Sequence, residues 1–232
     1  MASNAREAIL SALRQGLKRS PHPDAAGPRP GYDEPRPDIP EHDFWKKFQE
    51  ELEPLGAQVF FAKDKTEAKE SLTRILKERE IKSAVLWDHP VLEALGIEQI
   101  LQDAGLKIPP DAPGRKNFCA RAEAADLGVT SAQAVILESG SLVVRADKGL
   151  ERATSLIPPV HLAVVADPER LSHITDTAGL LRAWINKDGR LPSAVHVITG
   201  PSSTADIELV KVLGVHGPLE LIVLVVLKGH GT

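Results

Sequence analysis

The sequence predicts an α/β protein with a mixed, mostly parallel sheet flanked by helices, and three observations support this fold class. Helical patterns alternate with short apolar runs from Asp43 onward, which is typical of a sheet covered by helices. The longest apolar run, residues 221–227, has the length of one strand and indicates a buried parallel strand. Two other runs flank Glu138-Ser139-Gly140 closely enough to form a hairpin or an abrupt reversal, which suggests a mixed sheet. The expected strands are residues 58–62, 83–87, 134–137, 142–145, 162–166, 194–199 and 221–227.

The first 42 residues have a different pattern. Residues 5–17 place Ile9, Leu10, Leu13 and Leu17 on one face of a helix. Residues 21–40 are dense in proline, which blocks helix formation and sheet pairing. We therefore expect a helix in residues 1–20, an extended linker in 21–42 and one α/β domain in 43–232. The helix can fold back onto its own domain or, as we slightly favour, contact a partner or a second copy of the chain.

Composition excludes several functional classes. The 232 residues are 42% hydrophobic with few aromatic residues, which fits one aliphatic core. A formal net charge of −4 argues against a nucleic-acid binder, which normally has a clustered basic face. The chain has one cysteine, Cys119, so it cannot form an intrachain disulfide, and a cytoplasmic location is expected. Arg6, Glu7 and Arg14 interrupt the N-terminal apolar pattern, so we expect no signal peptide and no membrane span.

A loop rich in small hydroxylated residues follows the expected strand 194–199. Apolar residues at helical spacing in 206–213 predict a short helix that ends at Gly214, and Ser203 or Thr204 would cap it. The unpaired N–H groups of a helix start favour a phosphate or carboxylate. Alternatively, Ser203 and Asp206 form a variant capping box that needs no ligand. The candidate ligand residues are Gly200, Ser202, Ser203, Thr204 and Asp206.

Four other polar residues are candidates for function. Glu138 ends a buried strand, where its carboxylate can act as a base or nucleophile, or can accept hydrogen bonds from the turn or pair with an arginine. Asp88 is expected to cap the helix near Pro90, although its position also faces the ligand side of a parallel sheet. His216 either orients its loop or touches a ligand, and His161 is expected to fix the start of a strand.

Motifs for metals and nucleotides are missing from the sequence. The eight histidines are dispersed, and no His-Glu-x-x-His or Cys/His spacing indicates a metal site. The loop from Gly200 lacks the Gly-Lys-Ser/Thr ending of a P-loop, and no Gly-x-Gly-x-x-Gly follows an expected strand. The sequence therefore predicts neither a resident metal nor a bound nucleotide.

Two ordered blocks resemble the signature of the lactate-utilisation protein C family, the LUD domain. The first runs from Gly128-Val129-Thr130 through Glu138-Ser139-Gly140-Ser141-Leu142 to Leu156-Ile157-Pro158-Pro159-Val160-His161. The second runs from Thr199-Gly200-Pro201-Ser202-Ser203 to Val215-His216-Gly217-Pro218, and the resemblance covers most of the chain after about residue 45. Serine replaces the family's threonine at Ser139 and Ser141. Ser203 stands where the family is expected to have Arg or Lys, so this loop does not bring its own cation to an anion.

The resemblance implies the NagB/RpiA/CoA transferase-like fold and a subunit that oxidises L-lactate to pyruvate together with iron–sulfur proteins. One cysteine cannot hold a four-cysteine cluster, so the clusters are expected on partner subunits and no cofactor on this chain. CoA transferases of the similar fold use a glutamate near a glycine turn, which is an analogy for Glu138. We expect Glu138, Gly140 and Ser141 to share a cavity for a small anion with the loop from Gly200 to Asp206, at the carboxyl ends of neighbouring strands.

Two other functions remain open from the sequence. One is an independent small-molecule enzyme, such as an isomerase, cyclo-ligase or acyl-transfer enzyme, that uses Glu138 and the loop from Gly200 to Asp206. The other is a binding subunit without catalysis.

Overall fold

The structure, a computed structural model, describes residues 2–19, 40–110, 115–147, 151–205, 211–214 and 216–227. The chain forms two compact units, Met1–Asp38 and Ile39–Thr232. The first contains helix α1 (Ala2–Arg19), on which Ile9 and Leu13 are 61% and 57% exposed. Two of the four residues of the apolar face predicted for this helix are thus exposed. Among the described helices, none combines the length and the apolar content that a membrane crossing requires.

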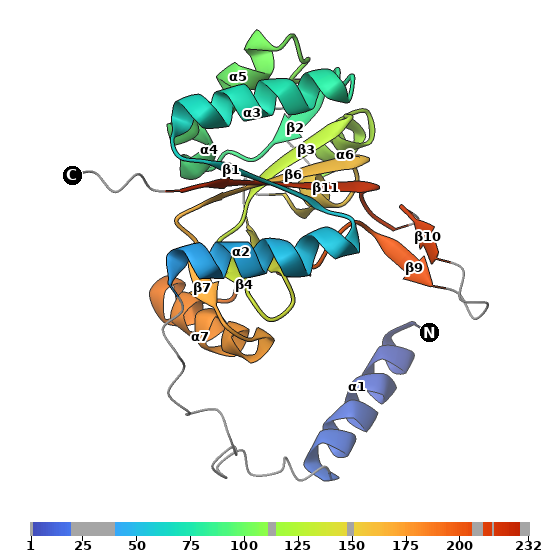
Figure 1. The fold of residues 1–232 in the computed structure, drawn as a ribbon. Helices are drawn as coiled ribbons and strands as arrows, with labels where there is room; N and C mark the ends of the chain where they lie inside the picture. Colours follow the sequence, from blue (N-terminus) through green and yellow to red (C-terminus); the bar gives the residue numbers. More distant parts are fainter. Residues whose placement is uncertain are drawn as a thin grey trace. The chain divides into compact units, whose positions relative to one another are not determined.

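Five parallel strands form the main sheet of the second unit, in the order β1-β11-β6-β3-β2 (Figure 1). The side chains from Leu221 to Val225 are at most 2% exposed, so the predicted buried strand is confirmed, as is the mostly parallel α/β fold. The strands are β1 (Gln58–Ala62), β2 (Ala84–Leu86), β3 (Leu127–Ser131), β6 (Val160–Ala166) and β11 (Glu220–Val226).

Helices cover both faces of the main sheet. Figure 1 shows α3 (Lys65–Glu78), α4 (Pro90–Leu95) and α5 (Ile97–Asp103) on one face and α2 (Glu41–Leu52) on the other. A 3-10 helix, η1 (Glu53–Leu55), continues α2. Helix α6 (Arg115–Glu123) packs against β2. The apolar face of α3 consists of four buried residues at helical spacing, Ala68, Leu72, Ile75 and Leu76.

A second sheet of order β7-β4-β5-β8 contains two antiparallel pairs, β4 with β5 and β5 with β8. Two residues, Ala132 and Gln133, separate β3 from β4, too few for the crossover that a parallel neighbour needs. The chain therefore leaves the main sheet and turns back after β4, which confirms the predicted hairpin at Glu138-Ser139-Gly140. The strands are β4 (Ala134–Ile136), β5 (Ser141–Ala146), β7 (Glu169–Leu171) and β8 (Ala194–Ile198).

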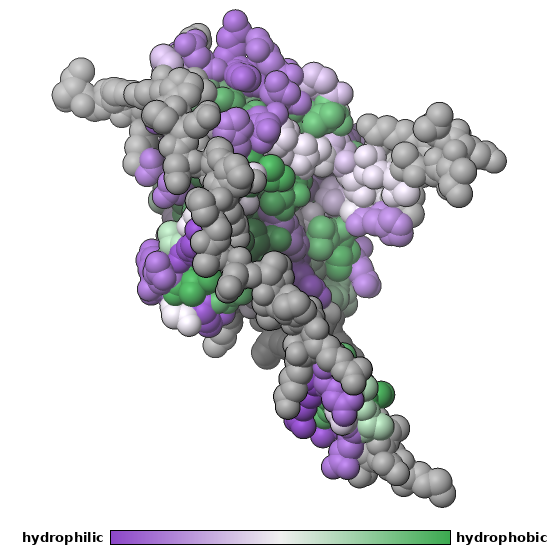
Figure 2. Space-filling view, turned by 90° about the horizontal axis from the view of Figure 1, so that it is seen from below, coloured by the Kyte–Doolittle hydropathy of each residue, from purple (hydrophilic) through white to green (hydrophobic). Residues whose placement is uncertain are grey.

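The two faces of the second sheet have different partners. Val135, Leu142 and Val144 point into the main core, whereas Ala134, Ile136 and Val143 form a smaller cluster with Leu180 and Trp184. Leu180 and Trp184 belong to α7 (Thr177–Asp188). Figure 2 views this side of the molecule and shows apolar areas between hydrophilic ones. Val197 of β8 is 43% exposed and Ile185 of α7 is 37% exposed.

The helix predicted for residues 206–213 is wrong for residues 211–213, and residues 206–210 lie outside the described residues. The structure instead pairs β9 (Ser203–Ala205) with β10 (Lys211–Leu213) in an antiparallel ribbon. The described strand residues 211–213 include the β-branched Val212, and an apolar run this short does not distinguish a helix from a strand. Ser203 and Thr204 therefore lie in a strand and cap no helix. Asp206 lies outside the described residues.

Candidate functional site

Three hydroxyl groups join the two signature blocks at the edge of the second sheet where β4 and β8 end. The Oγ atoms of Ser139 and Ser141 are 2.7 Å apart, and the Oγ of Ser141 is 2.6 Å from the Oγ1 of Thr199. Ser141 is fully buried and Thr199 is exposed. The turn after β4 and the loop after β8 thus meet at the same edge. They do not follow neighbouring strands, because β5 lies between β4 and β8.

The glycines of this edge are explained by packing. A Cβ atom on Gly140 would lie 2.7 Å from the backbone nitrogen of Leu52, and the φ of Gly140 is +59°. A Cβ atom on Gly200, whose φ is +102°, would lie 3.2 Å from the Cβ of Leu55. The end of α2 and the helix η1 therefore cover both glycines. Their small size lets the backbone approach, with or without a ligand nearby.

Glu138 is bound to a segment outside its own turn. Its Oε2 accepts a hydrogen bond of 3.0 Å from the backbone N–H of Ile174 and lies 3.6 Å from Nδ1 of His173. Ile174 begins the 3-10 helix η3 (Ile174–Asp176), which leads into α7. The side chain remains 50% exposed. The carboxylate therefore stabilises the start of η3, and its chemical role stays a prediction.

The loop after Gly200 is joined to the segment around His216. The N–H of Ser202 donates to the carbonyl of Pro218 (2.9 Å), and the N–H of Gly214 donates to the carbonyl of Ser202 (2.9 Å). Because the N–H of Ser202 has this partner, it is not a ready donor to an anion. The side chains of Ser203, Thr204 and His216 are exposed.

Two residues of the first signature block form a buried polar pair. Nε2 of His161, on β6, lies 2.8 Å from Oγ1 of Thr130 on β3, and both residues are fully buried. Burial, with a smaller contribution from His196, lowers the pKa of His161 to about 3. The imidazole is thus neutral near pH 7 and ties β6 to β3. Beside it, a Cβ on Gly128 would lie 1.8 Å from the carbonyl oxygen of Thr154 in the 3-10 helix η2 (Arg152–Ser155), so this position requires glycine.

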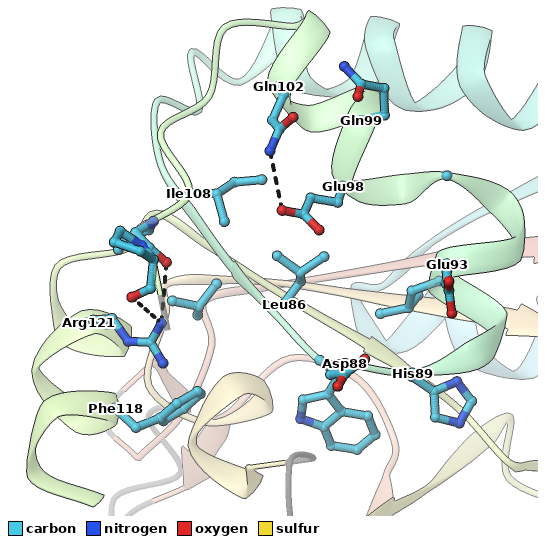
Figure 3. A pocket seen from close by; sticks show the side chains of 16 residues that line it. Leu86, Asp88, His89, Glu93, Glu98, Gln99, Gln102, Ile108, Phe118 and Arg121 are labelled. Atoms are coloured by element: carbon cyan, nitrogen blue, oxygen red, sulfur yellow. Dashed lines mark hydrogen bonds between the residues drawn. The ribbon is translucent and has the colours of Figure 1, made fainter. Parts of the chain in front are cut away.

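A separate cavity of about 790 Å³ lies at the carboxyl end of β2 (Figure 3). It falls within the usual size range of small-molecule sites, and the carboxyl edge of a parallel sheet is where such sites usually form. The polar side chains of its lining are Asp88, His89, Glu93, Glu98, Gln99, Gln102 and Arg121. Neither the hydroxyl edge of Ser139, Ser141 and Thr199 nor Glu138 contributes to this lining.

The first residues of this lining correct one prediction. His89, not Asp88, caps α4: its Nδ1 accepts a hydrogen bond of 3.2 Å from the N–H of Val91. Pro90 occupies the first position of the helix, which makes the preceding residue the cap. Burial lowers the pKa of His89, while the negative charge of Asp88 opposes that shift. Asp88 is left free of capping and faces the cavity.

Sequence reasoning missed most of this cavity. Glu93, Glu98 and Arg121 look like ordinary surface charges of three short helices, and only the packing of α4, α5 and α6 brings them together. The available signal was Asp88-His89 directly after a predicted strand. Within the described ranges, no three His, Cys, Asp or Glu side chains are placed to hold a metal ion.

Comparisons with known proteins agree with this architecture. A family model described as the LUD domain matches residues 45–226. A protein named Lactate utilization protein C from Geobacillus sp. (strain WCH70) is 32% identical over 166 residues, which cover 69% of this chain and 68% of that protein. The Uncharacterized protein YkgG of Escherichia coli (strain K12) is 36% identical over 160 residues, covering 68% and 69% of the two chains.

A solved structure supports the fold alone. The crystal structure of a DUF162 family protein from Deinococcus radiodurans superposes with a TM-score of 0.57 at 19% identity, covering 82% of this chain and 99% of that one. The family match includes every β-strand from β1 to β11, and hence both the hydroxyl edge and the cavity at β2. On this evidence the chain belongs to the LUD domain family.

Proposed function

We propose that this chain acts in lactate utilisation, as a subunit of a cytoplasmic system that oxidises L-lactate to pyruvate together with iron–sulfur partner proteins. The observation that carries the proposal is the match to several relatives named Lactate utilization protein C, about 30% identical over two thirds of the chain. The match spans the domain that contains both signature blocks.

The chemistry divides between this chain and its partners. Conversion of lactate to pyruvate removes two electrons and two protons, so the system needs an electron acceptor. This sequence contains one cysteine, Cys119, whereas iron–sulfur clusters usually need four thiolates. In the proposal the clusters therefore reside on partner subunits, and this chain contributes binding surface and a site for the small carboxylate.

The hydroxyl edge is the part of this chain best suited to such a carboxylate. Ser139, Ser141 and Thr199 together have three O–H donors, and two of these are used in the two hydroxyl contacts. One O–H donor therefore remains. The exposed hydroxyl of Thr199, at one end of the row of three hydroxyl groups, can donate it to an oxygen of the bound carboxylate. The exposed hydroxyls of Ser203 and Thr204 follow in the same loop. The cavity at β2 suits an anion less well, since three carboxylates line it.

Reconstitution tests this proposal. The chain is co-purified with its native partners, and lactate-dependent reduction of an artificial electron acceptor is measured with and without it. We expect activity to require the chain, and to fall in Thr199→Val, which preserves shape but removes the hydroxyl. Full activity of the partner proteins without this chain would contradict the proposal.

The cavity at β2 favours a second candidate, an independent enzyme acting on a small molecule. Asp88 and His89 lie next to each other there, at the carboxyl end of a parallel strand. The two candidates differ in a simple test, because an independent enzyme turns over its substrate as an isolated chain. A subunit without catalysis of its own would show activity only in the assembled system.

A further inference from the structure

The described residues that line the cavity at the end of β2 include more acidic than basic side chains. Asp88, Glu93 and Glu98 line it, whereas Arg121 is the one Lys or Arg among its described lining residues. Glu98 accepts a hydrogen bond of 3.2 Å from Gln102. No described residue donates a hydrogen bond to the side chain of Asp88 or Glu93. Two carboxylates at the cavity therefore lack a hydrogen-bond donor among the described residues, although the charge of Asp88 acts on the neighbouring His89.

The nearby described cations already have partners. The Nη1 atom of Arg121 donates to the carbonyls of Pro109 (3.2 Å) and Pro110 (3.0 Å), and the guanidinium lies over the ring of Phe118. Lys65 donates to the carbonyl of Ala94 (3.1 Å) and does not belong to the lining. In the described part of the chain, neither cation forms an ion pair with Asp88 or Glu93.

The floor between the carboxylates is apolar. Figure 3 shows Leu86 between Glu98 and Asp88, Ile108 beside Glu98, and Phe118 at the wall formed by α6. A fully hydrated ion gains nothing from such a floor, whereas a hydrocarbon stem is stabilised by covering it. The lining therefore matches a ligand with an apolar stem and a positively charged end.

The arrangement also argues against other ligands. Asp88, Glu93 and Glu98 come from different segments, and within the described part of the chain they do not gather into a metal-binding group. A carboxylate or phosphate would be repelled by the same three side chains. An organic cation is not repelled by these carboxylates, and it does not need them to be gathered into a metal-binding group.

We propose that this cavity binds an ammonium or guanidinium group on a short aliphatic stem. That chemistry has two sources, a free small amine or a lysine or arginine side chain of a partner protein. Asp88 and Glu93 bind the cation, and Leu86 and Ile108 cover the stem. The inference goes beyond the lactate role and does not depend on it, since its test measures binding to this chain alone.

Calorimetric titration of the full chain at low ionic strength tests the proposal with two probes. Agmatine represents the free amine, and the capped peptide acetyl-Gly-Lys-Gly-amide represents the partner side chain. We expect saturable binding of at least one probe, weakened by about two- to fivefold in Asp88→Asn and in Glu93→Gln, because an ion pair at an exposed carboxylate is worth about that factor. Tighter binding of agmatine indicates a free amine, and tighter binding of the peptide indicates a partner side chain.

Glu70→Gln is the matched control, because it removes the same charge from an exposed position of α3 outside the cavity. Its affinity for the probes should equal that of the unmodified chain. The proposal is overturned if neither probe binds, or if Glu70→Gln weakens binding as much as Glu93→Gln does. Asp88 and Glu93 are exposed, so the two variants should fold, which their thermal unfolding curves verify.

Discussion

The hydroxyl edge and the cavity at β2 differ in how their residues are distributed along the sequence and in how closely the chain packs around them. The hydroxyl edge consists of contiguous sequence blocks, and the chain itself packs tightly against it through Leu52 and Leu55. The cavity is assembled from separate helices and remains open over about 790 Å³. A recognisable motif in this chain therefore marks a place of close packing, whereas the open space lies where no motif points.

The largest expected effect tests the difference in packing. Gly140→Ala introduces a Cβ atom 2.7 Å from the nitrogen of Leu52 at a positive φ, and we expect a loss of about 2–5 kcal/mol in the free energy of unfolding. Gly96→Ala at the cavity also has a positive φ, but its Cβ would meet only the mobile end of Lys65, so we expect a loss of about 1 kcal/mol. Urea unfolding measures both. Equal losses would mean that the edge is not more tightly packed than the cavity.

The second effect compares the buried His161 with His89 at the cavity in how each contributes to the pH dependence of stability. The pKa of His161 is about 3 when folded, against an ordinary value of 6.5, so between these values the unfolded chain binds more protons. Its contribution to stability is therefore present above about pH 6.5 and is lost as the pH falls toward 3, by up to about 1.4 kcal/mol per pH unit.

His161→Gln should flatten this dependence, as measured by urea unfolding from pH 7 to pH 4.5. His89→Gln at the half-buried cavity position should flatten it less, since Asp88 offsets part of the effect of burial. An unchanged slope in His161→Gln would show that the histidine is accessible to protons in the folded chain.

A third, smaller effect is expected from the hydroxyl groups. Ser141→Ala removes the middle of the three hydroxyls and leaves those of Ser139 and Thr199 without this partner. We expect a loss of about 1–2 kcal/mol, because Ser141 is buried. Ser203→Ala, at an exposed position of β9, should change the free energy of unfolding by less than about 0.5 kcal/mol. Similar losses in the two variants would refute the hydroxyl contacts.

The smallest effect concerns Glu138. If its carboxylate serves to hold η3, Glu138→Gln retains an acceptor for the N–H of Ile174 and should leave both stability and lactate-dependent activity nearly unchanged. Activity is measured in the reconstituted system and stability by urea unfolding. A large loss of activity with unchanged stability would instead assign the carboxylate a chemical role.

Much of the fold could be predicted because strands of the core are apolar and bounded by turns. β1 occupies the predicted residues 58–62, and the other expected strands differ from the structure by a few residues at their ends. The sequence pattern does not predict β3, because Gly128 and Thr130 interrupt its apolar character, although both are needed for contacts with η2 and His161. β7 is three residues long and contains Glu169 and Arg170, so nothing distinguishes it from a loop.

The site was less predictable than the fold. The nearness of Ser141 and Thr199 could be anticipated from two motifs, but the helix expected after Ser203 could not be distinguished from a strand by its spacing. The cavity depends on tertiary packing, which local patterns do not encode. Residue type favours Asp88 as the cap of α4, whereas the position of Pro90 gives that role to His89.

The strand order of the main sheet has a consequence for biosynthesis. β1 is the first strand of the described chain, yet its partner is β11, the last one, with Gln58 opposite Ile222. A ribosome therefore releases β1 long before its neighbour exists, and that edge of the sheet cannot close co-translationally until β11 emerges. Pairing of such distant segments slows folding and leaves an unpaired strand open to aggregation meanwhile. Newly made copies of this chain should therefore depend on chaperones during synthesis more than their size alone suggests.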